Sequence, residues 1–220
     1  MASILKVDKL DPQSGTALEI GTSGDTITVP SGATFAVSGT MNASSITAGT
    51  LAVARGGTGT TSYSPGITEA DMWRITADQT NPSGDITANW ERVDTDGFAV
   101  LGSGLSESSG IFTFPSTGYW NITAYSKWNN PSADERYITF PIYTTLDNAS
   151  YDEAAGGTGN CSGGSSTRNG GAISSFIFDV TSTTNCKFKV QGHCSDSSTV
   201  LQGDSGRCET YVSVIRLGDT

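Results

Sequence analysis

The sequence predicts an all-β protein in two parts: an intertwined β shaft over residues 1–65 and a β-sandwich or jelly roll over residues 66–220. The first observation is composition, since the 220 residues include 29 Ser, 30 Thr and 27 Gly, which suit strands and turns better than long amphipathic helices. The second is low charge, at 15% against the usual quarter or so. The third is that all four Trp and seven of the eight Phe follow residue 65, so only the second part holds the side chains of a sizeable core.

The shaft is predicted from short apolar pairs in which the two members lie two residues apart. This spacing places both side chains on one face of a strand. The pairs bury too little apolar area to offset an ordering entropy of ~1–2 kcal/mol per residue. We therefore expect neighbouring copies to supply the missing half of the core, most simply in an interleaved homotrimer. The pairs are Leu18/Ile20, Ile27/Val29, Phe35/Val37 and Leu51/Val53.

The second part is predicted to contain about nine short strands and no helix longer than one turn, a pattern typical of sandwiches and jelly rolls. Alternation is clearest from Tyr119 to Tyr125, and the one helical turn is expected at Thr68–Met72. Trp73, Trp90 and Trp120 are expected in the core. The predicted strands are Met72–Ala77, Thr87–Val93, Gly97–Val100, Gly110–Phe114, Gly118–Lys127, Arg136–Thr144, Ala172–Val180, Cys186–Gln191 and Thr210–Arg216.

The segment Asp147–Gly171 is predicted to be a long surface loop, because it is rich in Gly, Ser and Asn. At about 25 residues it exceeds the loops that compact domains usually carry without a function. Trp128 is followed by Asn-Asn-Pro-Ser, so it is the tryptophan expected to lie nearest the surface. Both segments are therefore candidate binding loops.

The charge balance excludes several classes of partner. Twelve basic and 22 acidic side chains give a net charge of −10, which is unfavourable for binding nucleic acid or an anionic membrane. No run of 18 apolar residues is present, so we expect no membrane insertion. The first 13 residues contain no apolar stretch typical of a secretory signal peptide. Synthesis in the cytoplasm is therefore expected.

Four cysteines, Cys161, Cys186, Cys194 and Cys208, fall in the last 60 residues. Two disulfides with three alternative connectivities would account for them, although a reducing cytosol opposes disulfides until the protein is released. Free thiols are the equal alternative. Zinc is not expected, because these cysteines and His193 lack the paired close spacing of structural zinc ligands.

No cofactor is expected, and calcium is only a minor alternative. Asp94-Thr95-Asp96-Gly97 resembles the start of a calcium loop, but Leu105 stands where that loop needs a bidentate Glu. We interpret it as a hairpin turn. A weak site from Asp147, Asp152 and Glu153 is the remaining possibility for calcium.

No catalytic residue is expected. Gly203-Asp204-Ser205-Gly206 matches the sequence around the nucleophile of trypsin-like proteases, but Arg207 replaces the following Gly, and the lone His193 lies only twelve residues before Ser205. A triad needs a correctly placed His, so we interpret this motif as a turn. A polysaccharide hydrolase with two facing carboxylates is the enzymatic alternative.

Two stretches of the second part resemble C1q/TNF-like domains. Gly110–Thr123 is similar to the family's "G-x-F-x-x-P-x-x-G-x-Y" strand pair, and Tyr211–Leu217 to its last strand. Thr183-Thr184-Asn185 replaces the family's usual Gly-Asp turn. The resemblance implies a homotrimeric jelly roll whose last strand packs near the trimer axis.

The first part resembles fibre proteins of tailed bacteriophages, especially marine ones. The resemblance implies a structural virion protein, a tail fibre whose N-terminus joins other virion proteins and whose C-terminal globule attaches to a host-surface glycan or protein. A head fibre or capsid-decoration protein of the same build is the leading alternative. The matching stretches are Ile4–Asp8, Ser14–Gly21, Gly24–Ala33 and Ala54–Gly59.

Receptor binding, in this interpretation, falls to loop tips at residues 128–134, 147–171 and 195–206, on a trimer whose three weak sites gain avidity. The candidate receptor-binding residues are Trp128, Asn129, Asn130, Asp147, Asn148, Tyr151, Asp152 and Arg168.

Overall fold

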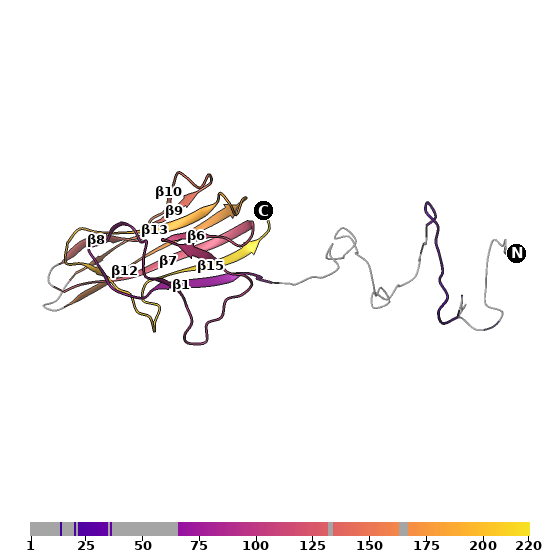
Figure 1. Cartoon of the computed structure of the whole chain (residues 1–220), viewed down its shortest axis with the longest axis horizontal. Helices are drawn as coiled ribbons and strands as arrows, with labels where there is room; N and C mark the ends of the chain where they lie inside the picture. The colour runs from indigo at the N-terminus through magenta and orange to yellow at the C-terminus, as the bar shows by residue number, and fades with distance from the viewer. Residues whose placement is uncertain are drawn as a thin grey trace. The chain divides into compact units, whose positions relative to one another are not determined.

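The computed structural model describes residues 14, 20, 22–34, 36, 66–131, 134–162 and 167–220. The chain divides into two units, Met1–Tyr63 and Ser64–Thr220 (Figure 1). In the first unit, residues 22–34 carry no strand, and Ile27 and Val29 are exposed. The pairs Phe35/Val37 and Leu51/Val53, and Leu18, lie outside the described residues, so the shaft and its trimer stay predictions.

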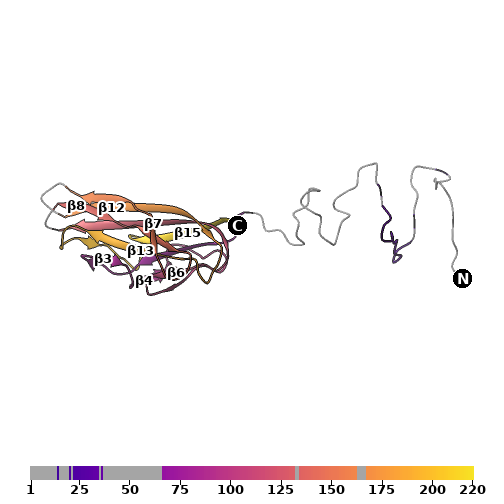
Figure 2. The same ribbon diagram turned by 90° about the horizontal axis from the view of Figure 1, so that it is seen from above.

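The second unit is a sandwich of two antiparallel sheets, which Figure 2 shows from above. The first sheet runs in the order β2-β14-β7-β15-β1-β4, and β12 pairs with the other edge of β7. Its strands are β1 (Ala70–Ile75), β2 (Gln79–Thr80), β4 (Trp90–Arg92), β7 (Gly118–Asn130), β12 (Arg168–Val180), β14 (Val200–Leu201) and β15 (Tyr211–Gly218).

The second sheet centres on β13, which pairs with β3, β6, β8 and β9. Strands β5, β10 and β11 extend it by pairing with β6, β9 and β8. The second sheet's strands are β3 (Ser83–Asp85), β5 (Ser106–Ser108), β6 (Ile111–Thr113), β8 (Glu135–Thr139), β9 (Ile142–Thr145), β10 (Asp152–Ala155), β11 (Thr158–Cys161) and β13 (Lys187–Cys194). No helix in the described part of the chain is long and apolar enough to cross a membrane.

An aromatic cluster fills the space between the sheets. Phe112 stacks on Phe188 with ring centroids 4.8 Å apart, and Trp90 meets Phe112 edge-on at 5.0 Å. Trp73 and Trp90 pack against the core and Trp120 is buried in it, which confirms the expectation for these three residues. Such edge-to-face and stacked pairs add to the stabilisation from burial alone.

Strand β7 follows the predicted alternation but extends three residues beyond it. Its even-numbered residues from 118 to 130 face the core, so Trp128 is fully buried. The Trp128 indole nitrogen donates to Ser126 Oγ at 2.7 Å. The expectation that Trp128 is exposed was wrong, because thirteen-residue pairing with β12 carries the strand past it.

Three other local predictions were wrong. The helical turn at Thr68–Met72 is replaced by the start of β1, whose residues from Ala70 pair with β15. Gly97–Val100 forms no strand. The strand predicted over Arg136–Thr144 is divided into β8 and β9, because Pro141 lies at the break and has no N–H for a sheet ladder. The carbonyl of Pro141 still accepts from Gln191 N at 3.1 Å.

Asp147–Gly171 is not one long loop, since it contains β10, β11 and the first residues of β12. Its glycines serve close approach between backbones. A Cβ at Gly157 would overlap the carbonyl oxygen of Ile173, and one at Gly159 would overlap that of Gly171. Glycine here lets two layers touch, a use of the residue that composition alone does not separate from a loop.

The sandwich has two distinct ends. At the terminal end, where the unit's first and last strands lie, Arg216 N donates to Glu69 O, and Gly118 pairs with Val180. At the distal end, Asn130 pairs with Arg168. In Figure 1 the C-terminus and the start of β1 lie at one end, and β8 lies at the other.

Candidate functional site

A buried carboxylate organises the distal end. Glu135, at the start of β8, is 1% exposed and accepts hydrogen bonds from Ser195 N and Asp196 N at 2.9 Å each. It also accepts from Thr199 Oγ1 at 2.5 Å and from the Ser195 hydroxyl. These donors all belong to residues 195–199, the distal loop, which joins β13 to β14. The distal loop is therefore held at both its ends by one side chain.

The hydrogen bonds keep Glu135 ionised. Burial raises the pKa of this carboxyl, but donation from Ser195, Thr199 and the loop backbone outweighs burial and lowers the pKa to about 2. A carboxylate that accepts several N–H and O–H groups is stabilised in its charged form. At neutral pH the anchor is thus fully charged.

Asn130, at the end of β7, is a second buried anchor of the distal loop. Its Nδ2 donates to Thr199 Oγ1 at 2.9 Å and to Asp196 Oδ1 at 3.1 Å, and its Oδ1 accepts from Ser198 Oγ at 3.2 Å. The loop consequently has one preferred shape, with Ser195 and Ser197 exposed. A fixed polar loop loses little conformational entropy on binding.

The candidate receptor-binding residues are not brought together. Asn129, Asn130 and Arg168 lie at the distal end, where Arg168 pairs with Asp134 at 2.6 Å. Of these, Asn130 is buried and structural. Asp147 and Asn148 lie at the terminal end instead, in the turn after β9, and Tyr151 and Asp152 follow them.

In the turn after β9, the carboxylate of Asp147 accepts hydrogen bonds from within the turn itself. Its Oδ1 accepts from the backbone N–H groups of Ala149 and Ser150, each at 2.8 Å, and from Thr145 Oγ1. These bonds lower the pKa of Asp147. No three acidic, His or Cys side chains in the described residues gather closely enough to hold a metal ion.

The Gly203–Gly206 motif forms the turn that its sequence predicts. Asp204 Oδ1 accepts from Gly206 N at 2.7 Å and Arg207 N at 3.0 Å. His193 lies on β13 in the other sheet. The residues of a protease triad are therefore not assembled around Ser205.

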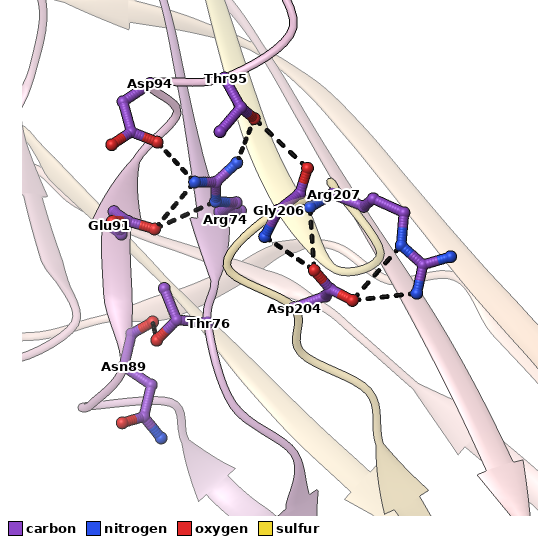
Figure 3. Close-up of polar contacts among 9 residues, drawn as sticks. All are labelled: Arg74, Thr76, Asn89, Glu91, Asp94, Thr95, Asp204, Gly206 and Arg207. Carbon is purple, nitrogen blue, oxygen red and sulfur yellow. Dashed lines mark hydrogen bonds and ion pairs between the residues drawn. The ribbon is translucent and has the colours of Figure 1, made fainter.

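Figure 3 shows the polar contacts that join this turn to Thr95 and, through Thr95, to the buried side chain of Arg74. Arg74 of β1 is 1% exposed, and its guanidinium donates to Glu91, to Asp94 and to Thr95 Oγ1. Thr95 Oγ1 in turn donates to the carbonyl of Gly206 at 3.3 Å. Asp94 and Thr95 thus belong to a structural turn that partners a buried cation. The turn was predicted, but the hairpin was wrong, because the next strand, β5, belongs to the other sheet and does not pair with β4.

All four cysteines are free thiols. Cys161 and Cys186 are buried, whereas Cys194 and Cys208 are half-buried. Burial, with smaller contributions from Glu135 and Asp196, raises the pKa of Cys194 to about 11. Its thiol is therefore protonated and weakly nucleophilic at neutral pH.

The outer sheet face, formed by β12, β7 and β15, is the second candidate surface. Two cross-strand rows cross it: an apolar row in which Tyr125 lies between Ile173 and Tyr211, and a mixed row in which Asn121 lies between Ile177 and Ile215. The isoleucines of β12 are 60% and 58% exposed, and the two tyrosine rings lie 5.5 Å apart. A row of hydroxyl residues, Ser175, Thr123 and Ser213, separates these two rows.

Sequence reasoning missed the distal anchors. Glu135 stands in an Asp-Glu-Arg run that resembles an ordinary charged surface turn. Nothing in the sequence joins it to residues about 60 positions later. The one usable indication was the cluster of Ser, Thr and Asp in residues 195–199, which is typical of a loop rich in side-chain-to-backbone hydrogen bonds.

Comparison with known proteins supports the fold. No family model matches the chain, and no curated protein matches it. Among solved structures, Eiger TNF from S. frugiperda is similar with a TM-score of 0.51 at 10% identity, over 70% of this chain and 96% of that one. Murine APRIL is similar with a TM-score of 0.46 at 10% identity, over 68% and 98%. The second unit is a TNF-like jelly-roll β-sandwich.

Proposed function

We propose that this protein is a homotrimeric fibre subunit of a tailed-bacteriophage virion that attaches the particle to the host surface. The observation that carries the proposal is that the two ends of the second unit differ. One end holds both of the unit's chain termini, the opposite end holds a rigid polar loop, and the outer sheet face between them exposes Ile173 and Ile177.

The outer sheet face supports self-association. Exposed Ile side chains that lie beside half-buried Tyr rings on the face of a sandwich are characteristic of a surface that another protein covers. Each buried Å² of apolar surface contributes about 25 cal/mol. A second and third copy of this chain are the simplest partners for this face. Ile27 and Val29 of the first unit are also exposed and would be buried by neighbouring copies.

The distal end supports attachment. A trimer built on the outer sheet face places three distal loops on one rigid body, so contacts that are weak singly gain avidity. The distal loop exposes Ser195 and Ser197 and carries one acidic side chain, Asp196, which suits hydrogen bonding to a host-surface glycan or protein. The virion assignment itself rests on the resemblance of the N-terminal stretches to phage fibres.

Attachment is tested by adding the purified full-length protein to cells of a susceptible bacterial strain before infection. We expect the protein to bind the cells and to reduce infection, and a Ser197→Arg variant to lose both effects. Gold-labelled antibody on intact particles then separates a tail fibre from a head fibre. If the full-length protein neither binds cells nor blocks infection, the attachment function is wrong.

A further inference from the structure

A polar pocket of about 150 Å³ opens on the outer face of the second sheet, and its lining includes no residue of the distal loop. Two cross-strand rows form its walls. One consists of Thr158, Thr139 and His193 from β11, β8 and β13. The other includes Glu153 and Tyr143 from β10 and β9. In Figure 1 strands β10, β9 and β13 lie next to one another, as their pairing requires.

The floor of the pocket is the break between β8 and β9. Thr139 and Tyr143 are half-buried and line the pocket, whereas the three residues between them, Phe140, Pro141 and Ile142, are buried. Thr139 and Tyr143 are four residues apart, a separation of ~13 Å along an extended chain. Pro141 lies between them and lines the pocket. The break between the strands thus separates two polar walls.

The Glu153 wall is built with its carboxylate in a fixed place. Tyr143 Oη donates to Glu153 Oε2 at 3.2 Å. Burial, and then Glu153 itself, raise the pKa of Tyr143, so its hydroxyl stays a donor. The other oxygen, Oε1, occupies the space that a Cβ at position 156 would fill, which only Gly156 leaves open. Glu153 Oε1 therefore lies against Gly156, which also lines the pocket.

The His193 wall is fixed by a relay of side chains. Asp85 Oδ1 accepts from Gln191 Nε2 at 2.7 Å, which orients the amide so that Gln191 Oε1 faces His193 Nε2 at 3.0 Å. The ring therefore donates from Nε2 and keeps Nδ1 as an acceptor when neutral. Lys189 is held by the same Asp85, at 2.7 Å. Both walls are thus pre-organised before any ligand arrives.

We propose that this pocket binds a single neutral sugar ring, with ring hydroxyls on Glu153, Thr139, Thr158 and His193. A carboxylate acceptor, a histidine ring and the hydroxyls of Thr139, Tyr143 and Thr158 around one small pocket match the several hydroxyl groups of a hexose. Glu153 and the net charge of −10 disfavour anionic sugars. This goes beyond the proposed function, because the pocket lies on a different surface from the distal loop.

Binding is tested by saturation-transfer NMR on the full-length protein with the methyl glycosides of glucose, galactose and mannose, and with glucuronic acid as the anionic comparison. We expect at least one neutral glycoside to bind with millimolar affinity, and glucuronic acid to bind more weakly. Glu153→Ala, and Gly156→Ala, which displaces the carboxylate, should each weaken binding about tenfold, equivalent to about 1.4 kcal/mol.

Asp152→Ala is the matched control, since it removes the neighbouring carboxylate, which does not line this pocket. It should leave glycoside affinity unchanged. If Glu153→Ala lowers thermal stability, Tyr143→Phe is used in its place. This variant keeps the aromatic ring of the side chain but removes the hydroxyl that holds Glu153, so it should weaken glycoside binding. The inference is wrong if no neutral glycoside binds, if the pocket variants bind like the wild type, or if glucuronic acid binds best.

These results are distinct from those on attachment. Glycoside binding without attachment to cells would overturn the proposed function and support the pocket. Attachment to cells without glycoside binding would overturn the pocket alone.

Discussion

Thr199 donates a 2.5 Å hydrogen bond to Glu135, and both side chains are buried at the distal end of the sandwich. The two residues are 64 positions apart: Glu135 is the first residue of β8, and Thr199 is the last residue of the distal loop. Their contact joins the start of β8 to the distal loop, so the shape of that loop depends on a charge that lies beneath it.

Replacing Glu135 with Gln should destabilise the protein by about 2–3 kcal/mol. The amide keeps the size of the side chain but presents an NH₂ group to donors of the distal loop, and a buried donor left without an acceptor costs about 1–3 kcal/mol, more when a charge is lost. Urea unfolding measures the change. Asp152→Asn, an exposed carboxylate, is the control and should change stability by less than about 0.5 kcal/mol. Equal stability of both variants would mean that Glu135 is no anchor.

The contribution of Glu135 should disappear in acid. Its pKa is about 2 in the folded protein, below the ordinary 4.5, so it stabilises the fold fully above pH about 4.5 and less as the pH falls towards 2. The stability difference between wild type and Glu135→Gln should therefore shrink over that window. Urea midpoints at successive pH values follow it, and a difference that stays constant down to pH 2 contradicts the prediction.

Charges on the outer sheet face should separate the copies. Light scattering should give about 68 kDa for the full-length protein, three times the 22.8 kDa of one chain. Ile173→Asp with Ile177→Asp should shift the mass towards that of a single chain, because carboxylates would be buried in an apolar contact. Leu146→Asp changes a similarly exposed residue in the turn after β9, outside the outer sheet face, and should keep the trimer. A single-chain mass for the wild type would exclude the trimer.

Gly157→Ala should destabilise the fold by about 1–3 kcal/mol, the usual range for overpacking. The new methyl group would overlap the carbonyl oxygen of Ile173, and backbone cannot move aside as a flexible side chain can. Gly206→Ala is the matched control, since the nearest atom to its Cβ would be Asp204 Oδ1 at 3.3 Å. Thermal unfolding compares the two. A tolerated alanine at 157 would restore the interpretation of this segment as a loop.

Elements with strong alternation could be predicted from the sequence, and elements made of small residues could not. The run from Tyr119 to Tyr125 has one apolar and one polar face, so β7 was predicted and is confirmed. Strands β10 and β11 carry Asp, Glu, Ala, Gly, Thr and Asn, which have no such pattern. Their pairing comes from neighbouring strands, and their glycines serve contact between backbones.

Composition and alternation by themselves determined that this is an all-β protein whose core lies after residue 65, because apolar period and aromatic content are local properties of the chain. Which residues form a site was decided by the tertiary structure alone. The distal loop depends on Glu135, and the pocket depends on rows drawn from β8 to β13, through pairings between residues far apart in sequence. Hydrogen bonds over such separations exist only after the sheets have formed, so no local pattern encodes them.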